Sequence, residues 1–97
     1  MWILRASEAS GSLTFRLASG TARTLGRAPT ADFILDVALV SRVHCRLVAG
    51  DDGLEVEDLA STNGTFLNNQ RIDHGRATGG DRLRVGRFEL VVERATP

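Results

Sequence analysis

The chain of 97 residues contains no lysine, no tyrosine and a single cysteine. With only Cys45, an internal disulfide is excluded and a cysteine-based zinc site is disfavoured. No apolar run approaches the roughly 20 residues that cross a bilayer. The N-terminal stretch MWILRASE reaches Arg5 after too short an apolar run for a secretory signal. We therefore expect a cytoplasmic protein that makes no membrane contact.

The chain also lacks net charge, because 12 basic residues balance 12 acidic ones. This balance argues against a protein that binds nucleic acid through general backbone affinity. Without lysine, recognition of an anion must use guanidinium groups, which are planar and always charged. Arginine and alanine in place of lysine suggest a GC-rich bacterial coding sequence. The length and an ordinary apolar content of 42% predict one folded domain over residues 1–97.

Apolar residues recur with a period of two, the spacing of a half-buried β-strand. The alternation is visible in SLTFRLA, VHCRLV and LEVED. In VHCRLV it places Val43, Cys45 and Leu47 on one predicted face, with His44 on the other. No window shows a sustained helical stripe. The pattern predicts an all-β protein.

Turn-forming stretches separate the predicted strands, among them HGRATGGD at residues 74–81 and Asn63-Gly64, which predicts a hairpin turn. Ten strands are predicted, at residues 1–5, 12–18, 22–27, 32–35, 43–49, 53–59, 65–68, 70–72, 82–86 and 87–93. Short strands at close spacing without intervening helices favour an antiparallel β-sandwich or barrel.

Three polar clusters fall at predicted strand ends: LGR at residues 25–27, SRVH at 41–44 and STNGTFLNN at 61–69. The first two contribute arginine forks and a serine hydroxyl. The third contributes the Thr62 hydroxyl, the Asn63 amide and a glycine turn that exposes backbone N–H groups. Together these groups suit a doubly charged phosphate monoester. The Asn63 amide also suits a peptide backbone, which needs a donor and an acceptor side by side.

Ser41 and His44 also permit a catalytic interpretation, with His44 as a base oriented by Asp58. The chain has no nucleophile elbow, however, and an extended backbone would separate Ser41 from His44 by about 10 Å. A structural histidine that hydrogen-bonds neighbouring loops is the favoured interpretation. A metal site has little support, because His44, Cys45 and His74 are the only soft ligands and Cys45 is expected in the core. We expect neither a metal nor another cofactor.

The three clusters resemble the motifs of a forkhead-associated (FHA) domain. GR at 26–27, SRVH at 41–44 and STNGTFLN at 61–68 occur in the family's order and at compatible spacing, and the likeness spans residues 22–92. The resemblance implies a β-sandwich of about eleven strands whose loops at one end bind phosphothreonine in partner proteins. It implies no catalysis. The partner would be a phosphorylated substrate of a serine/threonine kinase.

The resemblance also implies roles for individual residues. Arg27 and Ser41 would hold the phosphate, Arg42 and Thr62 would assist, and Asn63 would bind the peptide main chain. The residues expected to shape the loops are Gly26, His44 and Gly64.

The loop before Ser41 is expected to select the residue three places after the phosphothreonine. It contains Leu39 and Val40 and no basic residue, which favours an apolar ligand residue. Asn69 stands where the family often has glycine, and asparagine tolerates the left-handed conformation that the turn needs. Two other functions remain open: an FHA-like scaffold or docking domain that binds without phosphate, and a hydrolase that uses Ser41 and His44. The scaffold without phosphate binding is disfavoured because the pairs GR at 26–27, SR at 41–42 and TN at 62–63 are all intact.

Overall fold

The computed structural model of the chain describes residues 1–8 and 11–95, which form eleven strands and no helix. The strands are β1 (Trp2–Glu8), β2 (Gly11–Leu17), β3 (Ala22–Gly26), β4 (Phe33–Ile34), β5 (Cys45–Ala49), β6 (Leu54–Asp58), β7 (Thr65–Leu67), β8 (Gln70–Ile72), β9 (His74–Ala77), β10 (Arg82–Val85) and β11 (Phe88–Arg94). The all-β prediction is confirmed, and each of the ten predicted ranges overlaps one observed strand. This part of the chain accordingly holds no helix with the length and apolar character of a membrane span.

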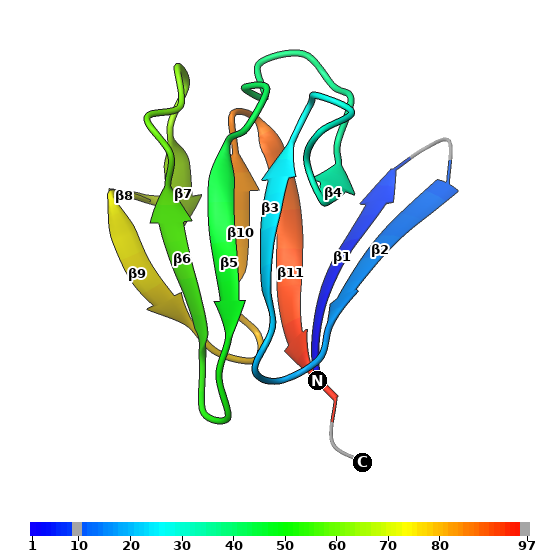
Figure 1. The fold of residues 1–97 in the computed structure, drawn as a ribbon, viewed down its shortest axis with the longest axis vertical. Helices are drawn as coiled ribbons and strands as arrows, with labels where there is room; N and C mark the ends of the chain where they lie inside the picture. The colour runs from blue at the N-terminus through cyan, green and yellow to red at the C-terminus, as the bar shows by residue number, and fades with distance from the viewer. Residues whose placement is uncertain (9–10, 96–97) are drawn as a thin grey trace.

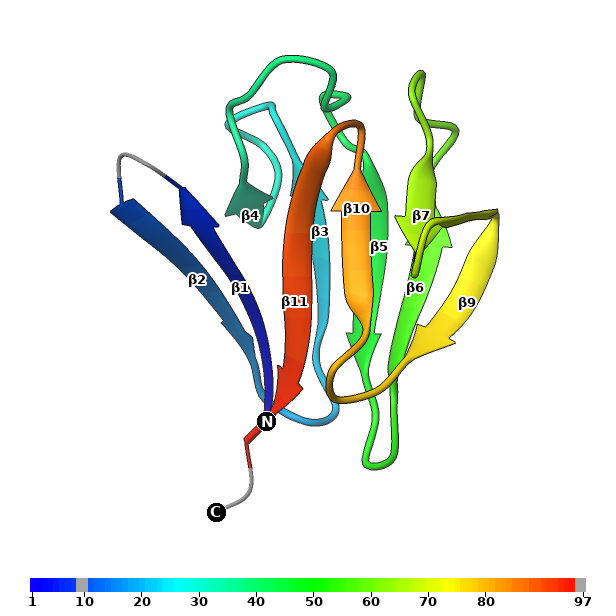
Figure 2. The ribbon, with the colours of Figure 1, turned by 180° about the vertical axis from the view of Figure 1, so that it is seen from behind.

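The strands form two sheets that pack face to face as a sandwich. One sheet has the order β2-β1-β11-β10-β7-β8 and the other the order β4-β3-β5-β6-β9. Figure 1 shows the five-stranded sheet in front, and Figure 2 shows the six-stranded sheet from behind. Neighbouring strands are antiparallel, as predicted, except β3 and β4, which run parallel over two residue pairs. The β3–β4 connection therefore crosses between parallel neighbours instead of forming a hairpin.

Strand β9 lies in a stretch that the sequence predicts as a loop, and that prediction is wrong. β9 pairs with β6 through Leu54 opposite Ala77 and Val56 opposite Gly75. A Cβ at Gly75 would lie 3.0 Å from Leu67 Cδ1, so the missing side chain lets the two sheets approach at this edge. The β9 sequence, HGRA, has little apolar alternation of its own. It is a strand because β6 supplies its backbone partner.

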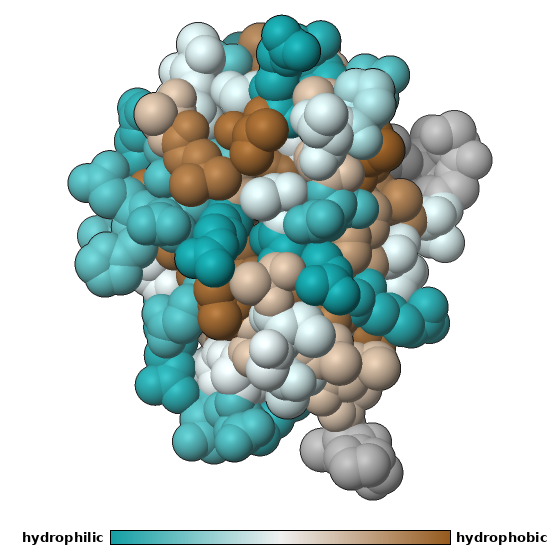
Figure 3. All heavy atoms as spheres, viewed as in Figure 1, coloured by the Kyte–Doolittle hydropathy of each residue, from teal (hydrophilic) through white to brown (hydrophobic). Residues whose placement is uncertain are grey.

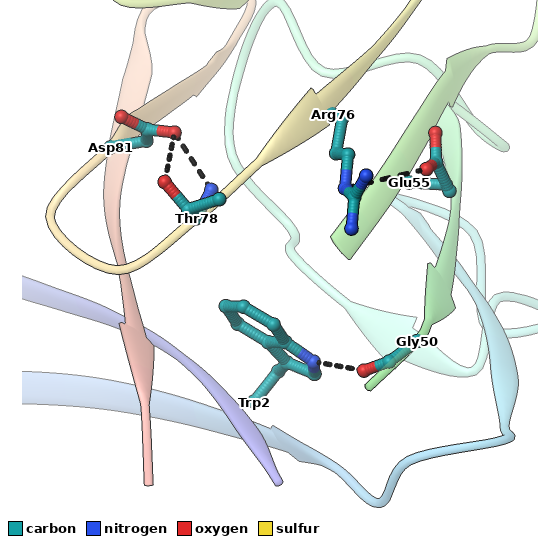
Figure 4. Close-up of polar contacts among 6 residues, drawn as sticks. All are labelled: Trp2, Gly50, Glu55, Arg76, Thr78 and Asp81. Carbon is teal, nitrogen blue, oxygen red and sulfur yellow. Dashed lines mark hydrogen bonds and ion pairs between the residues drawn. The ribbon is translucent and has the colours of Figure 1, made fainter. Parts of the chain in front are cut away.

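The core lies between the sheets and takes one face of each alternating strand. The largest fully buried apolar side chains are Trp2, Leu4, Leu17, Leu25, Leu47, Leu54, Leu83, Leu90, Val56, Val85 and Val92. Burying one such side chain stabilises the fold by about 1.5–3 kcal/mol relative to leaving it exposed. Polar groups at the chain-terminal end are paired: Trp2 Nε1 donates to the Gly50 carbonyl at 2.8 Å, and the Thr78 amide donates to Asp81 Oδ2 at 2.7 Å (Figure 4).

The sequence misplaces Val43, which is predicted on the buried face of Cys45 but is 38% exposed. β5 begins at Cys45, so Val43 lies in the preceding loop, and the period of two does not extend to it. His44 is fully buried instead. On the five-stranded face as a whole, hydrophilic side chains predominate and apolar surface is limited to small groups (Figure 3).

Four connections gather at the end of the sandwich away from the chain termini (Figure 1). They join β3 to β4, β4 to β5, β6 to β7 and β10 to β11. The prediction of a hairpin at Asn63-Gly64 is wrong, because β6 and β7 belong to different sheets and residues 59–64 cross between them. The tight hairpin turn is Asn68-Asn69, between β7 and β8, with φ of 50° and 68°. The left-handed conformation expected of Asn69 is confirmed.

Candidate binding site

The site is built on a close backbone approach at Gly26. The Arg27 amide donates to the Ser41 carbonyl at 2.9 Å, and the Ala28 amide donates to the Arg42 carbonyl at 3.0 Å. A Cβ at Gly26 would lie 2.2 Å from the Arg42 carbonyl oxygen, a distance no side chain can occupy. Glycine at this position therefore lets the end of β3 lie against the loop before β5. The contact brings Arg27 next to Ser41.

The Arg27 guanidinium is held by one hydrogen bond, from Nε to the Val40 carbonyl at 3.0 Å. Across residues 1–8 and 11–95, no carboxylate lies within 4.0 Å of it, since the ion pairs there involve other arginines. The Nε bond fixes the side chain and leaves its terminal nitrogens for a ligand. These nitrogens form the fork that binds a phosphate through two parallel hydrogen bonds.

Two further side chains are oriented by the facing loops. The Thr62 amide donates to Ser41 Oγ at 3.0 Å. This bond uses a lone pair, so the Ser41 hydroxyl hydrogen remains free to donate. Asn63 Nδ2 donates to the Leu39 carbonyl at 3.0 Å, which leaves Asn63 Oδ1 and one amide hydrogen free. The free pair matches the N–H and C=O of an extended peptide.

These groups line one open hollow of about 410 Å³ between the β4–β5 and β6–β7 loops. Its lining includes Arg27, Ser41, Thr62 and Asn63 together with residues 36–40. Arg42, which the sequence groups with them, instead lines an adjoining hollow of about 520 Å³. Arg27 and Asp36 line both hollows and so form the wall between them.

The two residues predicted to select ligand sequence lie in different environments. Leu39 lines the first hollow and is 42% exposed, with a left-handed φ of 72°. The Val40 side chain is only 2% exposed and belongs to the core. Val40 therefore cannot offer its side chain to a ligand, and its contribution is the carbonyl that holds Arg27. Selection by an apolar contact at Leu39 remains a prediction.

His44 links the loops from a fully buried position. The Ser41 amide approaches His44 Nδ1 at 3.0 Å, and because an amide can only donate, Nδ1 is the acceptor. Nε2 therefore carries the ring hydrogen and donates to the Gly64 carbonyl at 2.8 Å. Both ring nitrogens are occupied by backbone groups, and neither contacts the Ser41 hydroxyl. This is the arrangement of a structural histidine, as the sequence favours, and it does not form a Ser–His pair.

A hydrogen-bonded cluster that was not predicted from the sequence lies beneath the β6–β7 loop. Asp58 Oδ1 accepts from the hydroxyls of Ser61 and Thr65, and Asp58 Oδ2 accepts from the Ser61 amide at 3.2 Å. Ser61 Oγ in turn accepts from the Gly64 amide at 3.1 Å. The cluster fixes the loop that carries Thr62 and Asn63. An aspartate at a strand end, followed by serine three residues later, was the available signal.

Asp58 and its cross-strand neighbour Cys45 both have shifted pKa values. Burial raises the pKa of Asp58, but the hydrogen bonds from Ser61 and Thr65 outweigh it and leave the pKa below its ordinary value. Burial, aided by the Asp58 charge, raises the pKa of the Cys45 thiol to about 12. Cys45 therefore stays protonated at neutral pH and behaves as a core residue.

Removing the Asp58 charge should lower the free energy of unfolding at neutral pH. It should also make that free energy depend less on pH in the acidic range. Because the folded-state pKa lies below the ordinary 3.8, the stabilisation is complete above that value and is lost as pH falls through the folded-state pKa. We expect Asp58→Asn to cost about 1–2 kcal/mol at pH 7 and less below pH 3.8. Urea unfolding from pH 7 to pH 2 measures this. An equal loss at all pH values would contradict the stabilising role of the charge.

Asp81→Asn is a matched control. Asp81 also has a lowered pKa, mainly because the Thr78 amide donates to it, but it lies at the end of the sandwich away from the hollows. Both variants should therefore lose acid-dependent stability. Only Asp58→Asn should also alter the β6–β7 loop.

Comparison with known proteins places the chain in a family. The family model of the FHA domain matches residues 23–86. Over 81 residues the chain is 40% identical to the ABC transporter ATP-binding/permease protein Rv1747 of Mycobacterium tuberculosis, covering 84% of this chain and 9% of that protein. Over 68 residues it is 38% identical to the oxoglutarate dehydrogenase inhibitor of Corynebacterium diphtheriae, covering 70% of this chain and 48% of that protein. The chain thus spans less than half the length of these curated relatives.

The solved structures agree with the sequence comparison. An FHA domain solved in a structural and functional study of phosphothreonine-dependent FHA domain interactions superposes with a TM-score of 0.88 and 31% sequence identity. The superposition covers 99% of this chain and 98% of that one. This chain belongs to the FHA domain family.

Proposed function

We propose that this domain binds phosphothreonine peptides and so mediates phosphorylation-dependent interactions between proteins. The observation that carries the proposal is the convergence of Arg27, Ser41, Thr62 and Asn63 on one open hollow. These residues come from three separate loops, and backbone hydrogen bonds hold each loop in place. Family membership supports the same function.

The donors suit the charge and shape of a phosphate monoester. The group carries about −1.5 to −2 charges at pH 7 and three acceptor oxygens. Arg27 supplies a bidentate fork, and the Ser41 hydroxyl supplies a donor whose orientation is set by the Thr62 amide. Thr62 lines the same hollow and would offer its hydroxyl, and Arg42 would add positive charge from the adjoining hollow. A phosphate bound here would exchange water for charge-assisted hydrogen bonds.

The peptide chain is held beside the phosphate. Asn63 has a free amide hydrogen and a free oxygen because its other hydrogen is bonded to the Leu39 carbonyl. It would pair with one residue of an extended ligand. The exposed Leu39 side chain would contact an apolar residue further along the peptide, such as the one three places after the phosphothreonine.

The domain acts by binding and has no catalytic step. His44 uses both ring nitrogens on backbone groups, so it is not placed to take a proton from Ser41. The ligand would be a protein phosphorylated by a serine/threonine kinase, and the interaction would take place in the cytoplasm, where ATP-dependent phosphorylation occurs. Neither nucleic acid nor a cofactor takes part.

The proposal is tested by fluorescence polarisation with a degenerate phosphothreonine peptide pool, its unphosphorylated twin and a phosphoserine pool. We expect binding of the phosphothreonine pool and none of the unphosphorylated one. Ser41→Ala should weaken binding by about tenfold, because it removes a hydrogen bond to a charged group. Equal binding of phosphorylated and unphosphorylated pools would favour a phosphate-independent scaffold.

A further inference from the structure

A pair of arginines lies beside the β6–β7 loop and outside the two hollows. Arg84 of β10 is opposite Phe66 of β7 in register, and Phe66 is opposite Arg71 of β8. Directly opposed residues of antiparallel strands project from the same face of a sheet. The neighbours Leu83 and Val85 are buried, so Arg84, Phe66 and Arg71 form a row on the outer face of the six-stranded sheet.

Both arginines lie at the binding end of the sandwich, and the Arg84 guanidinium is held there by two contacts. Arg84 Cζ lies 3.9 Å from the centroid of the Phe66 ring, and Arg84 donates to the Gly86 carbonyl at 3.2 Å. Arg71 lies against Gly64: a Cβ at Gly64 would be 3.1 Å from Arg71 Nε and 3.2 Å from its Cζ. A side chain held as that of Arg84 is loses less conformational entropy when it binds a ligand.

Neither arginine has an acidic partner in the described part of the chain. The ion pairs found there are Arg5–Glu93, Arg76–Glu55 and Arg82–Glu89. Glu89 is opposite Arg84 in register, but its carboxylate pairs with Arg82 Nε at 4.0 Å. The row therefore presents two positive charges that form no ion pair, with the Glu89 carboxylate as the acidic neighbour of Arg84.

We propose that Arg71 and Arg84 form a second anion-binding subsite, which takes a carboxylate or phosphate carried by the same ligand beyond its phosphothreonine. The inference rests on the proposed function, in which Asn63 holds the ligand main chain. Gly64 follows Asn63 directly, so a ligand that continues past Asn63 toward Gly64 reaches Arg71 within a few residues at about 3.3–3.6 Å each. The planar forks of both arginines match carboxylate and phosphate geometry.

This subsite is separate from the contact expected at Leu39. Leu39 lines the first hollow, whereas Arg71 and Arg84 lie on the outer face of the six-stranded sheet. An apolar residue near the phosphothreonine and an acidic group farther along are therefore compatible in one ligand. The combination would narrow the range of phosphorylated proteins that bind.

The test compares three forms of one phosphothreonine peptide by fluorescence polarisation. One form carries two glutamines, the second two glutamates and the third a second phosphothreonine. In each form the position of these residues is varied from two to six residues before or after the first phosphothreonine. At low salt, wild-type protein should bind the best glutamate form about three- to tenfold more tightly than the matching glutamine form. A larger gain for the second phosphate would identify phosphate as the preferred source, and a larger gain for glutamate would identify carboxylate.

The combined Arg71→Gln and Arg84→Gln variant should lose this gain and bind the glutamine form as wild type does. Arg71→Gln alone leaves the Arg84–Phe66 contact intact and should lose part of the gain, so a folding defect cannot mimic the result. Arg46→Gln, an exposed arginine on the other sheet, should keep the full gain. No gain in wild type, or a gain that survives the double variant, overturns the inference. Loss of phosphate dependence in the glutamine form would instead overturn the proposed function.

Discussion

Replacing Arg27 by alanine should weaken phosphothreonine-peptide binding by about 10- to 150-fold. The estimate corresponds to about 1.5–3 kcal/mol, the range for hydrogen bonds to charged groups. Arg27 lines both hollows and its Nε bond to the Val40 carbonyl already orients it, so the substitution removes a pre-positioned fork. Isothermal titration calorimetry with one phosphopeptide selected from the pool measures the change.

Two further variants show whether the fork itself is responsible. Arg27→Lys keeps the charge but loses the bidentate geometry, and should give an intermediate affinity. Arg46→Ala removes an exposed arginine from the outer face of the other sheet and should leave the affinity unchanged. Raising the salt concentration should reduce the wild-type affinity more than that of Arg27→Ala. If Arg27→Ala bound as tightly as wild type, the phosphate would not lie in this hollow.

Gly26→Ala should destabilise the fold and disorganise the site together. The new Cβ would lie 2.2 Å from the Arg42 carbonyl oxygen and 2.8 Å from Val43 Cα, which are backbone atoms that cannot rotate away. The end of β3 must then separate from the loop before β5. The Arg27–Ser41 and Ala28–Arg42 backbone bonds would be lost. We expect a loss of about 3 kcal/mol, the upper part of the range for overpacking, or a fall in Tm of about 12–24 °C.

Gly79→Ala provides the matched control. A Cβ at Gly79 meets only ordinary contacts at 3.7–3.8 Å, so the same chemical change should alter stability by less than about 0.5 kcal/mol. Thermal denaturation of both variants measures the difference. A Gly26→Ala protein as stable as Gly79→Ala would show that the loop is not held against β3.

The fold was predictable where local pattern determines the strand. The period of two located strands such as β2 and β6 because their side chains alternate between core and solvent. It failed at β9, whose strand character comes from its backbone pairing with β6. It also failed at Val43, where the apolar alternation begins before β5 does. The hairpin expected at Asn63-Gly64 also failed, because sequence carries little information about which sheet the next strand joins.

The structure brings Arg27, Ser41, Thr62 and Asn63 of the predicted site to one hollow, and their roles in binding stay predictions. How the site is constructed was not predictable from the sequence. The motifs identified Arg27, Ser41 and Asn63, whose side chains bear the relevant chemistry. The supporting contacts depend on segments far apart in the chain, such as the carbonyls of Val40 and Leu39 that hold Arg27 and Asn63. Burial of the Val40 side chain likewise follows from packing, which the loop sequence does not reveal.

The most direct test of the account is an NMR titration of ¹⁵N-labelled protein with the phosphothreonine peptide pool and its unphosphorylated twin. We predict that the Arg27 Nε–H signal and the Thr62 amide signal shift with the phosphorylated pool only, because both groups lie at the first hollow. Amides at the opposite end, such as that of Thr78, should not move. Shifts that are the same for both pools, or that appear away from the hollow, would contradict the claim that this site reads phosphothreonine.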